Sequence, residues 1–154
     1  MDSLSTVCKL ASISRVGIWL LLHVFNSVEI VADLPEVDCI LVPVGGDMPL
    51  QSAISWTTEL LELLDIERAE ITLLHVGAEW TGELEVPARE GWEWYPVSRP
   101  GLVVSVILEV AEELTPDLVV MATQGGKGAL RGLLGSHTER VLHRVSCPVL
   151  AVPV

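Results

Sequence analysis

The stretch DLVVMATQGGKGALRGLLGS (117–136) places an apolar run directly before a loop that is rich in glycine. An unbroken apolar run of this length predicts a strand of a parallel sheet, buried on both faces. The next segment, SHTERVLHRV (136–145), has Ser136 and Glu139 in the spacing of a helix capping box. A strand that passes through a glycine-rich loop into a helix exposes backbone N–H groups, and these favour phosphate as a ligand.

Strand-like and helix-like segments alternate on both sides of this stretch. Asp47 and Pro49 suit the start of a helix of about 16 residues that follows a turn, GGD. The remaining expected elements are three strands before the stretch, one helix and a last strand: DCILVPV (38–44), EITLLHV (70–76), WEWYPV (92–97), GLVVSVILEVAEEL (101–114) and CPVLAVPV (147–154). The order β-α-β-β-α-β-α-β predicts a three-layer α/β sandwich with a mostly parallel sheet.

The N-terminal residues 1–36 do not follow this plan, so we interpret them as an extension and residues 37–154 as the domain. The run VGIWLLLHVF (16–25) is too short to span a bilayer. Lys9 and Arg15 precede it as in a signal peptide, but no convincing small-x-small cleavage site follows. We expect a buried element here, with membrane anchoring as the alternative.

The net charge of −12 argues against nucleic-acid binding, which needs a basic face. Residues 127–154 nevertheless carry a local balance of +3, from Lys127, Arg131, Arg140 and Arg144 against Glu139. This distribution suits an anion site after the glycine loop, and equally a solvated helix face. The three cysteines, Cys8, Cys39 and Cys147, form no CxxC pair, which is typical of a reducing compartment, and we expect a cytoplasmic protein.

Several sites of known chemistry are excluded by spacing. Gly128 follows Lys127 where a Walker A loop needs Ser or Thr, and no G-x-S-x-G elbow offers a nucleophile. His137 and His143 lie six positions apart, outside the i, i+4 spacing of a zinc-binding helix. The alternating aromatic residues 92–95 suit packing on a sheet better than ligand stacking. The sequence therefore predicts no catalytic residue and no metal site.

The ordered motifs ILVPV, AEITLLHV, PDLVVMAT, the glycine loop and CPVLAVPV resemble those of the universal stress protein family over residues 37–154. The loop resembles that family's ATP-binding pattern, G-x2-G-x9-G-[ST], from position 122 to Ser136. The resemblance implies a parallel five-stranded sheet of the adenine nucleotide alpha hydrolase-like fold. It also implies a homodimer joined through the last strand, and ATP as the ligand, to which Mg²⁺ could be bound.

Carried over by position, the resemblance implies contacts to the nucleotide at the ends of three strands, along the loop and at the helix start. These residues are Pro43, Gly45, Val76, Met121, Ala122, Thr123, Gly125, Gly126, Lys127, Gly128, Gly135, Ser136 and His137. Val76 would form an apolar wall for adenine, the glycines would let the backbone approach ribose and phosphates, and the Ser136 hydroxyl would bind a phosphate oxygen.

Two residues depart from the family pattern. Ala122 stands where the pattern has its first glycine, and Gly45 replaces the acidic residue of VPVDGS. The expected function is a nucleotide-binding regulatory protein that acts as a dimer in stress response. The alternative is an interaction module of the same family that has lost the ligand. An enzyme with slow ATP hydrolysis ranks below both, because no general base is evident.

Overall fold

The computed structural model describes residues 20–22, 36–44, 50–81, 83–123 and 136–153. The expected alternation of strands and helices is confirmed across these residues, with one additional short strand at the N-terminal side. The elements are β1 (Leu20–Leu22), β2 (Cys39–Val44), α2 (Leu50–Leu63), β3 (Ala69–Val76), β4 (Trp92–Arg99), α3 (Val103–Leu114), β5 (Leu118–Thr123), α4 (Ser136–Leu142) and β6 (Val149–Pro153).

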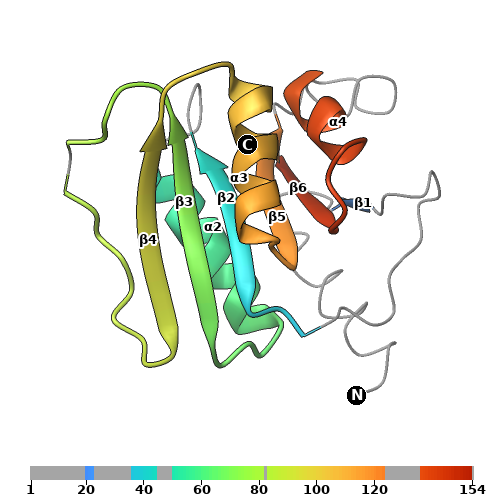
Figure 1. The fold of residues 1–154 in the computed structure, drawn as a ribbon. Coiled ribbons are helices and arrows are strands. Elements are labelled where there is room, and N and C mark those ends of the chain that lie inside the picture. Colours follow the sequence, from blue (N-terminus) through green and yellow to red (C-terminus); the bar gives the residue numbers. More distant parts are fainter. Residues whose placement is uncertain (1–19, 23–35, 45–49, 82, 124–135, 154) are drawn as a thin grey trace.

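Strands β2 to β6 form a five-stranded parallel sheet in the order β6-β5-β2-β3-β4 (Figure 1). The fold is therefore the predicted α/β sandwich with a five-stranded parallel sheet. Strand β1 adds to the outer edge of β6 and runs antiparallel to it, with Leu21 opposite Leu150. The sequence pattern did not predict this strand. The side-chain burial expected for residues 16–25 lies outside what the structure describes.

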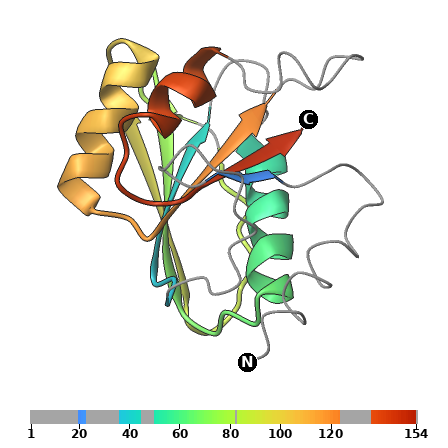
Figure 2. The same cartoon turned by 90° about the vertical axis from the view of Figure 1, so that its right-hand side faces the viewer.

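Helix α2 covers one face of the sheet, and α3 and α4 cover the other (Figure 2). Alternate residues of a strand point to opposite faces. In β2 accordingly, Ile40 and Val42 pack in the core beneath α2, whereas Leu41 packs in the core beneath α3 and α4. All three are fully buried. A strand with two buried faces explains why its sequence reads as a continuous apolar run.

Helix α2 packs on the sheet through residues at helical spacing. Ala53, Ile54, Thr57, Leu60 and Leu61 are its buried positions, which recur every three or four residues. The predicted capping residues of this helix, 47 and 49, lie outside the described residues. The proposed capping box at the start of α4 is likewise not described, because the side chain at position 136 is outside the described part.

Strand β4 is the outer strand at the opposite end of the sheet. Trp92 is buried, and its Nε1 donates a hydrogen bond to the carbonyl oxygen of Ile66 at 3.0 Å. Trp94 packs against the same core, whereas Tyr95 is exposed. The expectation that these aromatic residues serve sheet packing is confirmed for both tryptophans. Pro96 lies in the middle of the strand, where proline is tolerated because an edge strand has no neighbour on its outer side.

Candidate functional site

The sheet reverses its strand order between β5 and β2. From β2 the chain continues to its neighbour β3 on one side, and from β5 it continues to β6 on the other. In open α/β sheets ligands bind beyond the carboxyl ends of the strands at such a switch point. The loops that leave β2 and β5 there are residues 45–49 and 124–135, and both lie outside the described residues.

The two central strands diverge toward this switch point. Strands β2 and β3 pair over six positions, and β5 and β6 over five. The recorded pairing between β2 and β5 comprises only Ile40 with Leu118 and Leu41 with Val119, at the start of both strands. The arrowheads of β2 and β5 accordingly point apart in Figure 2. In the described backbone, the carboxyl-terminal halves of β2 and β5 are therefore not paired with each other. These unpaired halves lead into the two loops.

The described members of the predicted nucleotide set lie at this end of the sheet. Pro43 is half-buried near the end of β2, and Val76 is the half-buried last residue of β3. Met121 is buried in β5, in the core beneath α3 and α4, against which Val76 also packs. Ala122 and Thr123 continue β5 opposite Val152 and Pro153 of β6.

Helix α4 brings the last two members to the same region. Ser136 is its first residue, and His137 follows with an exposed side chain. The remaining predicted residues lie outside the described part of the chain, so their contacts are not described: Gly45, Gly125, Gly126, Lys127, Gly128 and Gly135. The structure thus brings together the strand ends and the helix start that flank the glycine-rich loop.

Trp80 lies beside this end of the sheet, and the sequence pattern did not single it out. Its ring meets the ring of His75 edge-on, with centroids 6.0 Å apart, and its backbone N–H donates to Ser98 Oγ at 2.9 Å. His75 is thus held by a neighbouring ring, which agrees with a structural role for this histidine. The signal available in the sequence was a tryptophan four residues after the end of a strand, in a loop that carries Gly77.

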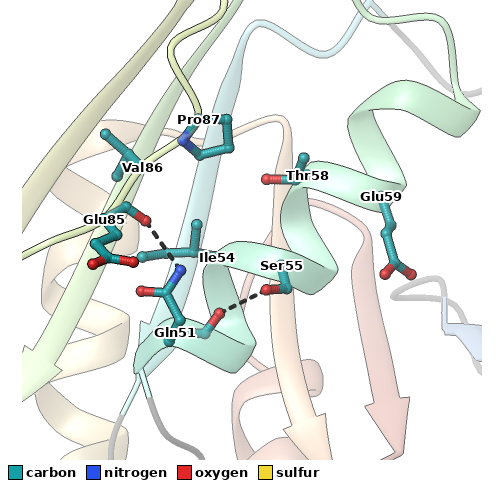
Figure 3. A pocket seen from close by; sticks show the side chains of 8 residues that line it. All are labelled: Gln51, Ile54, Ser55, Thr58, Glu59, Glu85, Val86 and Pro87. Carbon is teal, nitrogen blue, oxygen red and sulfur yellow. Dashed lines mark hydrogen bonds between the residues drawn. The ribbon is translucent and has the colours of Figure 1, made fainter.

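A hollow of about 390 Å³ lies between α2 and the segment that contains Glu85, Val86 and Pro87 (Figure 3). At one end, Gln51 Nε2 donates to the carbonyl oxygen of Glu85 at 3.0 Å. The lining has two carboxylates and no basic side chain: Gln51, Ile54, Ser55, Thr58, Glu59, Glu85, Val86 and Pro87. Carboxylates in the lining repel phosphate. This hollow is therefore less suited to a nucleotide than the switch point is.

A second hollow, of about 370 Å³, lies between the C-terminal end of α3 and the amino end of β6. Arg144 and Cys147 both line it. Burial raises the pKa of the Cys147 thiol to about 11, so the group is neutral at physiological pH. Cys147 is buried and Cys39 is partly buried, as is typical of free cysteines that pack as small apolar residues. This hollow lies at the amino ends of the strands, away from the switch point.

Within the described ranges, no three His, Cys, Asp or Glu side chains are grouped so that they could hold a metal ion. In the same ranges, every helix is too short or too polar to cross a bilayer.

Comparison with the sequences of known proteins matches part of the chain. The model of the Universal stress protein family matches residues 95–153. A universal stress protein of Methanocaldococcus jannaschii is 48% identical over 52 residues, which cover 34% of this chain and 31% of the relative. Universal stress protein A homolog 1 of Coxiella burnetii is 46% identical over 52 residues, which cover 34% of this chain and 35% of that relative. The matches thus span about a third of these curated relatives.

Solved structures are similar over a larger part of the chain. The universal stress protein UspA of Lactobacillus plantarum has a TM-score of 0.55 at 19% identity and covers 77% of this chain and 99% of its own. An Arabidopsis thaliana family protein with AMP bound has a TM-score of 0.51 at 19% identity, with coverage of 75% and 91%. A universal stress protein in complex with cAMP has a TM-score of 0.50 at 19% identity, with coverage of 77% and 98%.

At these identities the structural matches establish the fold. The sequence evidence comes from the family model, which matches residues 95–153, and from the curated relatives, which match over 52 residues. The chain therefore has the fold of these universal stress proteins, and its sequence similarity to the Universal stress protein family is carried by residues 95–153.

Proposed function

We propose that this protein binds ATP or a related adenine nucleotide at the switch point between β2 and β5 and acts as a regulatory module in stress response. The observation that carries the proposal is the early end of the β2–β5 pairing at Leu41 and Val119. Beyond this point the two strands lead into the loops of residues 45–49 and 124–135, and the second is the glycine-rich loop. A nucleotide needs an opening of this kind beside backbone N–H groups.

The two ends of the nucleotide would meet different surfaces. Val76 is half-buried at the end of β3 and would offer an apolar wall to adenine. The glycine-rich loop begins after Thr123 and ends at Ser136, where the start of α4 adds N–H groups for phosphate. The AMP and cAMP complexes of proteins with this fold support a nucleotide as the ligand class.

The proposal includes a homodimer joined along β6 and a cytoplasmic location. Strand β6 consists entirely of uncharged residues, VLAVP, and lies near the edge of the sheet. An apolar strand of this kind is hazardous when it is uncovered, and pairing with a second copy covers it. We assign no catalytic step to the protein, because the sequence offers no general base for a γ-phosphate.

Native mass spectrometry of the purified protein tests this function directly, since it reports bound nucleotide and the number of chains together. Calorimetric titration with ATP, ADP, AMP and cAMP then ranks the ligands. We expect saturable one-site binding of at least one of them. The absence of both a co-purified nucleotide and a binding heat would reject the proposal.

The alternative function is an interaction module without a ligand, and two residues favour it. Ala122 adds a methyl group where the family pattern has glycine, and Gly45 lacks the carboxylate found in VPVDGS. If neither wild-type protein nor a variant with both family residues restored binds nucleotide, this second function replaces the first. A phosphate-release assay with ATP and Mg²⁺ tests the absence of turnover.

A further inference from the structure

Strand β1 occupies the outer edge of β6. Leu20, Leu21 and Leu22 pair antiparallel with Ala151, Leu150 and Val149. Strand β1 comes from the N-terminal segment, 16 residues before β2, and lies beside β6 in Figure 1. The edge through which the proposed homodimer would form is thus partly covered by the same chain.

We infer that β1 is an intramolecular cap that competes with a second copy of this chain for the outer edge of β6. The inference rests on the homodimer in the proposed function and adds how its formation is controlled. In the capped form β1 covers the edge, and in the dimer the β6 strand of another copy takes its place.

The strand directions support this competition. Two copies joined edge to edge by a two-fold axis must place their β6 strands antiparallel, because the axis reverses the strand direction. Strand β1 already runs antiparallel to β6, so it uses the same backbone N–H and C=O groups that a second copy would use. The two modes of pairing therefore exclude each other over Val149–Ala151.

The lengths of the strands make the cap displaceable. Strand β1 pairs with three residues of β6, which is five residues long. A second β6 strand can extend the ladder to Val152, whereas Pro153 has no N–H to donate. Neither strand carries a charged residue, so no like charges would face each other along a ladder of two β6 strands.

Connectivity makes the competition depend on protein concentration. Strand β1 belongs to the same chain as β6, so its effective concentration is fixed by the linking segment. The concentration of a second copy rises with the amount of protein. Capping therefore dominates in dilute solution, and dimerisation takes over as the concentration rises.

The test is a full-length double variant, Leu20→Pro with Leu21→Pro. Adjacent residues of an antiparallel strand send their N–H groups to opposite sides, so two prolines in succession remove a ladder donor whichever position holds it. The matched control is Leu20→Val with Leu21→Val, which keeps both N–H groups and the preference for a strand. Circular dichroism checks that all three proteins retain their fold.

Sedimentation velocity over a range of concentrations measures the dimer dissociation constant. We expect the proline variant to dimerise at least about tenfold more tightly than wild type, and the valine control to stay within about threefold. Equal dissociation constants for wild type and the proline variant would reject the cap and leave the dimer intact. A proline variant that stays monomeric at every concentration would reject both. Nucleotide binding, measured by calorimetry on the same samples, is independent of either result.

Hydrogen exchange on wild-type protein provides a second test that needs no variant. The amides of Leu20–Leu22 should lose protection as the concentration rises and dimers form, while those of Val149–Ala151 remain protected. Protection of β1 that does not change on dimerisation would contradict the competition, even if the proline variant fails to fold.

Discussion

The carboxylate of Asp117 accepts the backbone N–H of Cys39 at 2.9 Å, and the N–H of Asp117 donates to the carbonyl oxygen of Cys39 at 2.8 Å. The same carboxylate oxygen also accepts the N–H of Asp38 at 3.0 Å. These bonds join the amino ends of β5 and β2. The two strands are therefore held together at one end and separate toward the switch point at the other.

Removing this carboxylate should destabilise the fold. Asp117→Ala leaves the N–H groups of Asp38 and Cys39 without their acceptor, and bonds to a charged group are worth about 2 kcal/mol in total at a partly exposed site. Asp117→Asn keeps one oxygen and should lose about half as much. Urea unfolding of the three proteins gives the free energies, and an alanine variant as stable as wild type would contradict this role.

Gly91→Ala should be strongly destabilising. Gly91 has φ of +91°, and a Cβ added there would collide with the backbone carbonyl oxygen of Glu67. Left-handed strain alone costs roughly 1–3 kcal/mol, and the backbone collision adds to it. The comparison variant is Gly101→Ala, where φ is +142° and the Cβ would meet a side-chain methyl of Val106 at 2.7 Å. Thermal unfolding should show the larger loss of Tm for position 91, and the reverse order would argue against the backbone collision.

Ionisation of Cys147 should lower the stability at high pH. Burial raises its pKa from 9.0 to about 11, so the folded state binds a proton that the unfolded chain has released. A raised pKa gives a contribution to stability that is complete below pH 9 and is lost as the pH rises toward 11. The loss is on the order of 2 kcal/mol.

The control for this prediction is Cys147→Ala, in which the thiol is absent. Its free energy of unfolding should be lower at pH 8, because a buried side chain is shortened, yet should fall less steeply between pH 9 and 11. Equal slopes in the two proteins would show that the thiol does not contribute.

Nucleotide affinity should respond to the glycine-rich loop and to its two departures from the family pattern. Gly125→Val should abolish binding, because a branched side chain blocks the approach of the backbone to the ligand and resists positive φ.

Ala122→Gly with Gly45→Asp should strengthen binding by about tenfold, equivalent to one additional polar contact. Calorimetry measures both, and a Gly125→Val variant with wild-type affinity would place the ligand elsewhere.

The phosphate-binding end of the proposed site can be tested separately. Affinity should weaken as salt is added, because screening reduces the attraction of Lys127 and Arg131 for phosphate. Ser136→Ala should lower affinity and cost about 1 kcal/mol of stability through the loss of a helix cap. Urea unfolding in the absence of nucleotide separates the second effect from the first. An affinity that does not change with salt would contradict an ionic contribution.

The parallel sheet could be predicted because its strands have a recognisable sequence pattern. Leu41 and Val119 belong to continuous apolar runs, and parallel strands buried on both faces require such runs. The buried face of α2 could also be predicted, because Ile54 and Leu61 recur at helical spacing. The start of α4 at Ser136 was predicted correctly, but the helix ends at Leu142, three residues before the predicted end at 145.

Strand β1 and Trp80 could not be predicted from local pattern. Leu20–Leu22 is apolar enough for a strand, but its partner β6 lies more than 120 residues away, and a hydrophobic period does not identify a partner. The position of Trp80 against His75 depends on how a loop folds back onto the sheet. The strand ends assigned to the proposed nucleotide site came from the family pattern, and the sheet shows that they lie at the same edge.

Pro96 lies in the strand that bounds the opposite side of the sheet from β6. Proline has no N–H for a further neighbour, and Glu93 and Arg99 add charge to the same strand. If further copies of the chain could pair with both edge strands of the sheet, they would add repeatedly and form a filament. If only one edge strand can pair, association ends at a dimer. Because β4 does not favour pairing and β6 does, exposing the edge of β6 should yield dimers and not fibres.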